Sequence, residues 1–405
     1  MKIVILTNEY PPYVYGGAGV HVEYLTRELA NLEGKKHSVE VLCFGNQKEN
    51  AGNLTVEGID PGIALPYQDP RHRKFMDTLS RNIVMAGSVA EADIVHCHTW
   101  YSHLAGCLLK PLVKARLVLT THSLEPHRPW KVEQLGTAYQ ASSWVEKTAY
   151  ENADGVIAVS ESMRRDVHDL YGVPFEKIGV IYNGIDLNEF RHSPNPEVLA
   201  SYQINPDKPF VLFVGRITRQ KGIIHLVNAI QHISKDIQIV LCAGAPDTEE
   251  VGREMASKVE EAQIKSHNDI IWISRIIPKK DLVALYSHAS LFICPSVYEP
   301  FGIINLEAMA CGTPVVASAT GGIPEVVVHN ETGLLISFEP VSSADFEPRD
   351  PERFSYDLAT AINNLLANPD KAEAMARKSR QRVEQHFSWS SIAQKTLEFY
   401  KGLLK

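Results

Sequence analysis

Short runs of β-branched and other apolar residues recur along the first half of the chain, separated by stretches with the hydrophobic period of helices. The runs are IVILT (3–7), VEVLCF (39–44), DIVHCH (93–98), RLVLTTH (116–122), GVIAVS (155–160) and IGVIYNG (178–184). Continuously apolar strands that alternate with amphipathic helices are typical of a parallel sheet covered on both faces. The first half therefore predicts a doubly wound α/β domain.

The same pattern starts again after a passage that contains Pro194, Pro196, Pro206 and Pro209. Six further runs follow: FVLFVGR (210–216), IQIVLCAG (237–244), DIIWIS (269–274), ASLFICPS (289–296), TPVVASA (313–319) and TGLLIS (332–337). Prolines concentrated between two such patterns are typical of a linker or a domain edge. We predict two Rossmann-like, doubly wound parallel-sheet domains, over residues 1–190 and 191–387.

The C-terminal part of the chain has a different character. Residues 338–354 are acidic, contain prolines and lack a period, which predicts a surface loop. From Pro351 to Lys405 the pattern is helical, with a break expected around residues 387–389.

Composition narrows the function classes. A chain of 405 residues exceeds what one core usually organises, and 44% apolar with 22% charged residues is ordinary for a globular protein. The net charge of -8 argues against nucleic-acid binding. No apolar run has the length of a membrane span, and the first residues, MKIVILTNEY, predict a strand rather than a signal peptide. The six cysteines form no CxxC pair and predict buried free thiols in a reducing compartment, which favours the cytoplasm.

Glycines and polar residues that could bind a ligand or take part in chemistry follow the predicted strands in both halves. They are Gly16, Gly17, Gly19, His98, Trp100, His122, Asn183, Arg216, Lys221, Gly244, Glu299, Gly321 and Gly322. Ligands of open α/β sheets bind at the carboxyl ends of the strands. Two such sheet edges facing each other would enclose a cleft between the domains, and we expect the site in that cleft.

Some of these groups have two interpretations. The sequence GGAG at 16–19 suits either a tight strand-to-helix turn or the close approach of a phosphate to backbone N–H groups, and it is not a GxGxxG motif. His96 and His98 share one face of a strand, as two metal ligands would, but no third ligand stands at a recognisable spacing. We predict no metal. Arg216 and Lys221 are either a solvated pair or the counter-charge of a diphosphate, in the role that Mg²⁺ takes elsewhere.

The segment SVYEPFGIINLE (296–307) carries the strongest chemistry. Glu299 there is either a carboxylate near a helix start, favoured by the helix dipole, or a ligand of sugar hydroxyls. The N–H groups at the start of the helix, at Gly302, Ile303 and Ile304, would bind the distal phosphate of a nucleotide-sugar. Glu307, about one turn beyond Ile303, would accept hydrogen bonds from a ribose diol.

The E-x7-E pair of Glu299 and Glu307 resembles the signature of retaining glycosyltransferases with the GT-B fold. The motifs GGAG (16–19), VGR (214–216) with Lys221, and YNGID (182–186) extend this resemblance over essentially the whole chain. HCHTWYSHLAG (96–106) followed by THSLEPHRPWKVEQLGTAY (121–139) resembles the actinobacterial-type glycogen synthase group, which includes α-maltose-1-phosphate synthases. The longer bacterial glycogen synthases carry Asp where this chain has Thr99, which favours the shorter group.

The resemblance implies a glucosyltransferase that forms an α-1,4 bond with retention and needs no cofactor or metal. It implies catalytic roles for His122 against the donor sugar, Glu299 at the glucosyl hydroxyls, and Arg216 and Lys221 at the diphosphate. The donor-binding residues would be Gly16, Gly17, Gly19, Phe301, Gly302, Ile303, Ile304 and Glu307. The final helix, about 388–405, would pack back onto the N-terminal domain.

Substrates are less well determined. The resemblance implies ADP-glucose, although the residues alone do not separate ADP from UDP or GDP. For the acceptor, glucose-1-phosphate or a glucan chain, the candidates are His98, Trp100, Arg128, Lys131 and Asn183. Arg128 and Lys131 would recognise the phosphate of glucose-1-phosphate, or else belong to an ordinary charged loop.

Three other functions stay open at this point. A lipid-linked sugar transferase would use RHRKFMDTLSRNIVMA (71–86), a segment that also reads as an ordinary amphipathic helix. A sugar-nucleotide epimerase shares the fold, and a non-catalytic nucleotide-binding protein is the third alternative. The oligomeric state stays open, a homo-oligomer included.

Overall fold

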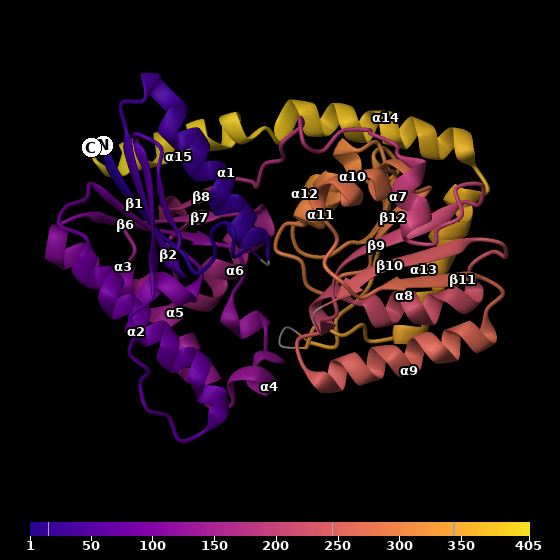
Figure 1. The fold of residues 1–405 in the computed structure, drawn as a ribbon, viewed down its shortest axis with the longest axis horizontal. Coiled ribbons are helices and arrows are strands. Elements are labelled where there is room, and N and C mark those ends of the chain that lie inside the picture. Colours follow the sequence, from indigo (N-terminus) through magenta and orange to yellow (C-terminus); the bar gives the residue numbers. More distant parts are fainter. Residues whose placement is uncertain (15, 245, 343–344) are drawn as a thin grey trace. The chain divides into compact units, whose positions relative to one another are not determined.

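The computed structural model of the chain describes residues 1–14, 16–244, 246–342 and 345–405. The chain forms two compact units. Unit 1 comprises Met1–Gly184 and Trp389–Lys405, and unit 2 comprises Ile185–Ser388. Each unit is a twisted sheet with helices packed on its faces (Figure 1). Among the described helices, none has both the length and the apolar character needed to cross a membrane.

Unit 1 contains an eight-stranded sheet with the order β3-β4-β2-β1-β5-β6-β7-β8. All neighbouring strands are parallel except β3 and β4. The strands are β1 (Lys2–Leu6), β2 (Ser38–Phe44), β3 (Lys48–Asn50), β4 (Leu54–Ile59), β5 (Ile94–His98), β6 (Arg116–Thr121), β7 (Gly155–Ala158) and β8 (Ile178–Val180). The apolar runs did not predict β3 and β4, because β3 is fully exposed and β4 is only half buried.

Seven α-helices accompany this sheet in the described part of unit 1. They are α1 (Gly17–Asn31), α2 (Arg73–Ser88), α3 (His103–Val113), α4 (Lys131–Leu135), α5 (Ala138–Asn152), α6 (Glu161–Tyr171) and α15 (Trp389–Leu403). The last helix is integral to unit 1, since Ile392, Leu397 and Tyr400 are buried in one core with Ile3 and Ile5.

Unit 2 contains a six-stranded, all-parallel sheet with the order β11-β10-β9-β12-β13-β14. The strands are β9 (Phe210–Arg216), β10 (Gln238–Gly244), β11 (Asp269–Ile273), β12 (Leu291–Cys294), β13 (Val315–Ser318) and β14 (Gly333–Ile336). The helices are α7 (Pro196–Ser201), α8 (Ile223–Ala229), α9 (Glu249–Lys265), α10 (Lys279–His288), α11 (Ile303–Ala310), α12 (Ile323–Val326), α13 (Pro351–Leu366) and α14 (Pro369–His386). The predicted class, two doubly wound Rossmann-like α/β halves, is confirmed.

Local predictions fared unevenly. The proline-rich passage holds the helix α7, which Pro196 opens at a position where the missing N–H costs nothing. The break at 387–389 is present between α14 and α15, but a second break before Pro369 was not predicted. Of the loop expected at 338–354, residues 343–344 lie outside the described residues, and its last residues already belong to α13. All six cysteines are free thiols, and all but Cys107 are buried.

Candidate active site

In unit 2, Lys221 and Glu299 form a largely buried ion pair. Lys221 Nζ donates to Glu299 Oε2 over 2.7 Å, and the side chains are only 18% and 8% exposed. Ser296 Oγ donates to the same carboxylate oxygen over 3.1 Å. The structure therefore brings together two residues that stand far apart in the sequence and were both predicted to be catalytic.

Close backbone approaches fix the loops that carry this pair. Lys221 lies just before α8, where the Thr218 hydroxyl accepts from its backbone N–H. Gly222 follows with φ 60°, and a Cβ there would lie 2.0 Å from the Pro295 carbonyl oxygen. On the other side, a Cβ at Gly321 (φ 52°) would lie 2.0 Å from the Glu299 carbonyl oxygen. Only glycine suits both positions, so these residues set the position of the ion pair.

Arg216, at the end of β9, has a carboxylate partner that the sequence analysis missed. Its Nη1 donates to Asp247 Oδ1 over 2.6 Å. The available signal was the position of Asp247, shortly after β10, a strand that pairs with β9. Both cations proposed for a diphosphate are therefore paired with carboxylates of their own unit.

Helix α11 begins beside Glu299. Gly302 precedes it with φ 99°, a conformation that favours glycine, so the chain turns sharply into the helix. Phe301 is buried, with its ring 6.0 Å from that of Phe387. Ile303 and Ile304 form the first turn, which holds no acidic residue, so the positive end of the helix dipole is not neutralised from within the helix.

Glu307 lies one turn into the same helix. Its Oε2 accepts from the Tyr286 hydroxyl over 2.9 Å. Loss of solvent around the carboxyl raises the pKa of Glu307 to about 7. The carboxyl group therefore changes charge near neutral pH.

In unit 1, four histidines gather where the strands end. His98 Nδ1 and His122 Nε2 share a hydrogen bond of 2.9 Å, and the ring centroids of His21 and His122 are 4.8 Å apart. His96 is bonded to Tyr400 Oη and Thr120 Oγ1 instead. Burial lowers the pKa of all four imidazoles, that of His21 to about 4. The cluster is neutral at pH 7.

Asn183 fixes the proton of His21. Its Oδ1 lies 2.6 Å from His21 Nδ1, which must donate, so that His21 Nε2 keeps its lone pair. His21 was not predicted, although it stands one helical turn beyond Gly17. One ligand atom from each of His21, His98 and His122 lies within 4.8 Å of the others, so these three could hold a metal ion. His96, which the sequence offered as a second metal ligand beside His98, is not part of that group.

The glycine loop before α1 surrounds a carboxylate. Gly16 N donates to Glu9 Oε2 over 2.9 Å. A Cβ at Gly19 would lie 2.8 Å from that oxygen, and Gly17 opens the helix. Glu9 is buried and was not predicted from the sequence. Its carboxylate lies at the helix start, where we expected either a tight turn or a bound phosphate.

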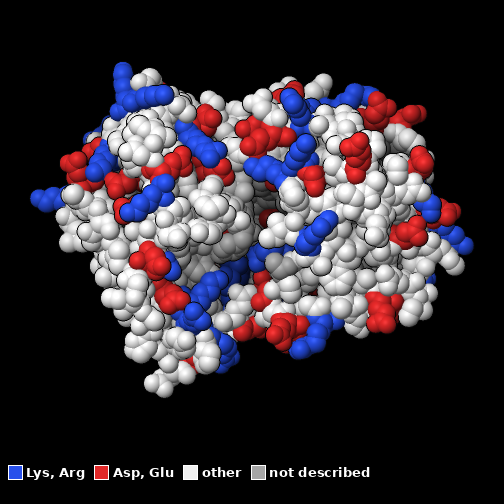
Figure 2. Space-filling view, in the orientation of Figure 1, with Lys and Arg blue, Asp and Glu red and all other residues white. Residues whose placement is uncertain are grey.

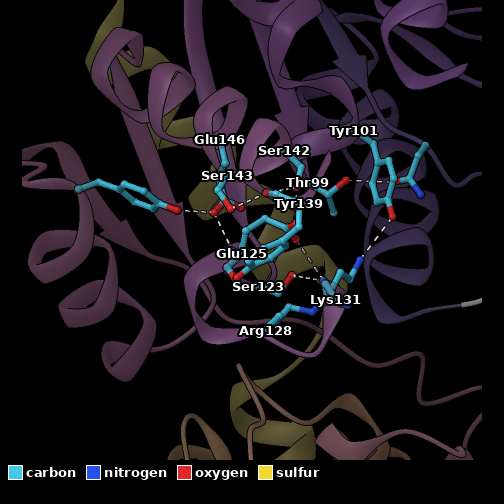
Figure 3. A network of polar contacts seen from close by, with 12 residues as sticks. Thr99, Tyr101, Ser123, Glu125, Arg128, Lys131, Tyr139, Ser142, Ser143 and Glu146 are labelled. Carbon is cyan, nitrogen blue, oxygen red and sulfur yellow. Dashed lines mark hydrogen bonds and ion pairs between the residues drawn. The ribbon is translucent and has the colours of Figure 1, made fainter. Parts of the chain in front are cut away.

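Two of the acceptor candidates, Arg128 and Lys131, belong to one network of polar contacts in unit 1 (Figure 3). Arg128 Nη1 donates to Ser123 Oγ over 3.1 Å and lies 3.8 Å from Glu125 Oε1. Lys131 Nζ donates to Tyr101 Oη over 3.4 Å. Trp100 is buried, with its ring 4.2 Å from that of Tyr101. Trp100 is thus a packing residue here, and Arg128 and Lys131 already have polar partners.

A buried carboxylate pair supports this loop. Glu125 N donates to Glu146 Oε2 over 2.8 Å, and Ser142 Oγ donates to Glu125 Oε2 over 2.9 Å. Burial, and then the neighbouring Glu125 carboxylate, raise the pKa of Glu146. The sequence gave no signal for this pair, because the two glutamates come from separate elements.

Two family models match the chain, one for each half. Residues 15–189 match Glycosyltransferase Family 4, and residues 195–382 match Glycosyl transferases group 1. The chain is 43% identical to the α-maltose-1-phosphate synthase of Mycolicibacterium smegmatis over 99% of both chains. It is 29% identical to the glycogen synthase of Mycobacterium tuberculosis, covering 99% of this chain and 94% of that protein. The solved sucrose-phosphate synthase of Thermosynechococcus elongatus superposes with a TM-score of 0.79 at 26% identity, over 100% of this chain and 99% of that one.

Proposed function

The chain belongs to the GT-B glycosyltransferases, and from that membership we propose that it is a retaining glucosyltransferase that uses ADP-glucose as donor and glucose-1-phosphate as acceptor. The product would be maltose-1-phosphate with a new α-1,4 bond. The observation that carries this proposal is the end-to-end similarity to an α-maltose-1-phosphate synthase at 43% identity.

In this proposal Arg216 and Lys221 bind the donor diphosphate. In the structure each cation donates a hydrogen bond to a carboxylate: Arg216 to Asp247 at 2.6 Å and Lys221 to Glu299 at 2.7 Å. A diphosphate carries more charge than one carboxylate and can accept from both cations. The two cations then stabilise the leaving diphosphate as its bond to glucose breaks, which is electrostatic catalysis without a metal.

The remaining contacts with the donor would be made by helix α11 and the residues just before it. The first N–H groups of α11, at Gly302, Ile303 and Ile304, would bind the distal phosphate. Glu307 would accept from the ribose hydroxyls in its ionised form. Glu299, released from Lys221, would hold glucosyl hydroxyls.

His122 is proposed to contact the donor sugar as a neutral imidazole. Burial lowers its pKa well below the usual range, so that it can donate and accept hydrogen bonds at pH 7 without placing a charge beside the sugar. His98 and Asn183, assigned above to the acceptor side, would act by orienting this histidine cluster. Arg128 and Lys131 stay candidates for the acceptor phosphate.

Elongation of a glucan chain is the second candidate. The 29% identity to a glycogen synthase over nearly the whole chain favours it. Because the residues do not determine the base, a UDP- or GDP-sugar donor is a variant of the same proposal. We place the enzyme in the cytoplasm, in keeping with its free cysteines.

The decisive experiment offers ADP-, UDP- or GDP-glucose together with glucose-1-phosphate or glycogen. Nucleotide release, product mass and the anomeric proton coupling of the product are measured. We expect ADP release with a disaccharide phosphate whose new bond is α. Transfer of glucose mainly to glycogen would make the protein a glucan-elongating synthase. If no nucleotide were released with either acceptor, the proposed substrates would be wrong.

A further inference from the structure

Unit 1 contains a pocket of about 600 Å³ whose walls carry four cationic side chains. The cations are Arg71, Arg73, Lys74 and Arg81, from the start and middle of α2 and the turn before it. The opposite wall includes Asn8, Phe44 and Tyr101, which follow or end β1, β2 and β5. The pocket therefore lies at the carboxyl edge of the sheet, where open α/β sheets bind ligands.

Aromatic rings hold the cations in place. Lys74 Nζ lies 5.2 Å from the centre of the Tyr101 ring, and Lys131 Nζ lies 5.6 Å from the same centre. The Arg81 guanidinium lies 5.1 Å from the centre of the Phe44 ring and also donates to the Ile59 carbonyl at the end of β4. These contacts position charge without neutralising it.

Carboxylates balance these charges unevenly, and one of them, Asp77, lines the pocket itself. Arg71 is paired with Asp69 at 2.7 Å, whereas the contacts of Arg73 and Arg81 with carboxylates are 3.9 and 4.0 Å long. Within the described residues, Lys74 Nζ has no carboxylate within 4.0 Å. Lys and Arg side chains gather on this face of unit 1 around α2 and α4 (Figure 2). A concentration of positive charge in a chain of net charge -8 calls for an anionic ligand.

We propose that this pocket binds the phosphate of the acceptor sugar, with Lys74 and Arg71 as its main ligands and Lys131 reaching it across Tyr101. This inference rests on the proposed function, since it supplies the phosphate subsite of that reaction. In this proposal the segment 71–86, considered above for a lipid-linked acceptor or as an ordinary amphipathic helix, selects a phosphorylated acceptor.

Size and chemistry favour a small sugar phosphate. A volume near 600 Å³ lies within the range of small-molecule sites, and a phosphate group accepts both a forked guanidinium and a point-charge ammonium. A neutral glucan would gain nothing from four cations. The pocket thus gives a physical reason for preferring a sugar phosphate over glycogen.

Gly136 shows that the site for Arg71 is built by the fold. This residue has φ 55°, and a Cβ there would lie 2.9 Å from the Arg71 guanidinium carbon. A larger residue after α4 would displace Arg71 from its present position. The neighbouring His72 is bonded to Thr137 over 2.9 Å, which ties the start of α2 to the same turn.

The test compares Lys74→Gln, Arg71→Gln and the double variant with Lys36→Gln. Lys36 is an exposed lysine of unit 1 before β2, at the opposite edge of the sheet, so its loss removes the same charge outside the pocket. We measure the KM for glucose-1-phosphate at saturating ADP-glucose and the calorimetric Kd of glucose-1-phosphate without donor. ADP release with maltose as a neutral acceptor is the third readout.

We expect the KM and Kd for glucose-1-phosphate to rise about tenfold in each single variant and about 100-fold in the double variant. The control and the reaction with maltose should not change. If the unaltered enzyme transfers to glucose-1-phosphate and the pocket variants match Lys36→Gln, the pocket assignment is wrong and the proposed function stands. If the unaltered chain binds glucose-1-phosphate through the pocket but does not glucosylate it, the function is wrong and the pocket stands. No binding at all by the unaltered chain overturns the pocket assignment.

Discussion

The polar groups at the carboxyl edges of the two sheets differ in charge and in how they are paired. In unit 1, burial keeps His21, His98 and His122 neutral, and His98 and His122 share a hydrogen bond. In unit 2, Arg216 and Lys221 are paired with carboxylates at 2.6 and 2.7 Å. One edge avoids charge, and the other balances it.

Under the proposed function, this difference would match the two halves of a glycosyl transfer. A leaving diphosphate needs cations that are already in place, and carboxylate partners keep such cations positioned while the site is empty. A sugar ring that gains positive charge is better served by neutral donors and acceptors, which do not repel it. The comparison leads us to expect that each sheet edge binds a different part of the substrate.

The largest effect is expected from removing a charge in unit 2. Lys221→Ala should lower kcat about 1,000-fold, because it removes a stabilising cation from the leaving diphosphate and leaves the buried Glu299 carboxylate without its partner. Lys235→Ala, an exposed lysine of the same unit, is the matched control and should behave as the unaltered enzyme. Steady-state kinetics with ADP-glucose provide the measurement. A loss below tenfold would mean that the cation is not needed at the leaving group.

The next effect comes from introducing a charge in unit 1. Asn183→Asp places a carboxylate beside His21 and should raise the pKa of His21 from about 4 by one to three units. We expect kcat/KM to fall about tenfold at pH 6 and to recover as the pH rises. Asn183→Ala removes the hydrogen-bond acceptor without adding charge, so it should lower activity by the same factor at pH 6 and at higher pH. Identical pH profiles for the two variants would show that neutrality of the cluster does not matter.

A smaller effect concerns pH and the donor. The pKa of Glu307 is raised to about 7, so the carboxyl becomes protonated as the pH falls through 7 and loses an acceptor for the ribose. The KM for ADP-glucose should therefore be about tenfold higher at pH 6 than at pH 8. Glu307→Gln should remove this dependence, with kcat at saturating donor as the internal control. A KM that is flat with pH in the unaltered enzyme would exclude the ribose role.

The sequence predicted what depends on local pattern. Twelve apolar runs predicted every strand of the two sheets except β3 and β4, and the E-x7-E spacing located helix α11. It could not predict partners from distant segments, such as Asp247 for Arg216 or Asn183 for His21, which lies 162 residues away. It also could not show that Glu9 fills the glycine loop, because a glycine-rich turn has the same sequence whether a phosphate or a carboxylate lies beside it.

The last prediction is that removing metal ions has no effect on activity. It tests whether the carboxyl edge of either sheet needs a metal. In the proposed function, Arg216 and Lys221 supply the positive charge that Mg²⁺ would otherwise bring to a diphosphate, so dialysis against EDTA should leave ADP-glucose turnover unchanged. The competing possibility lies in unit 1, where ligand atoms of His21, His98 and His122 lie within 4.8 Å of one another. Loss of activity on dialysis, restored by Zn²⁺ in the unaltered enzyme but not in His98→Gln, would assign catalysis to a metal at the neutral edge. Unchanged turnover would leave the charged edge as the source of leaving-group stabilisation.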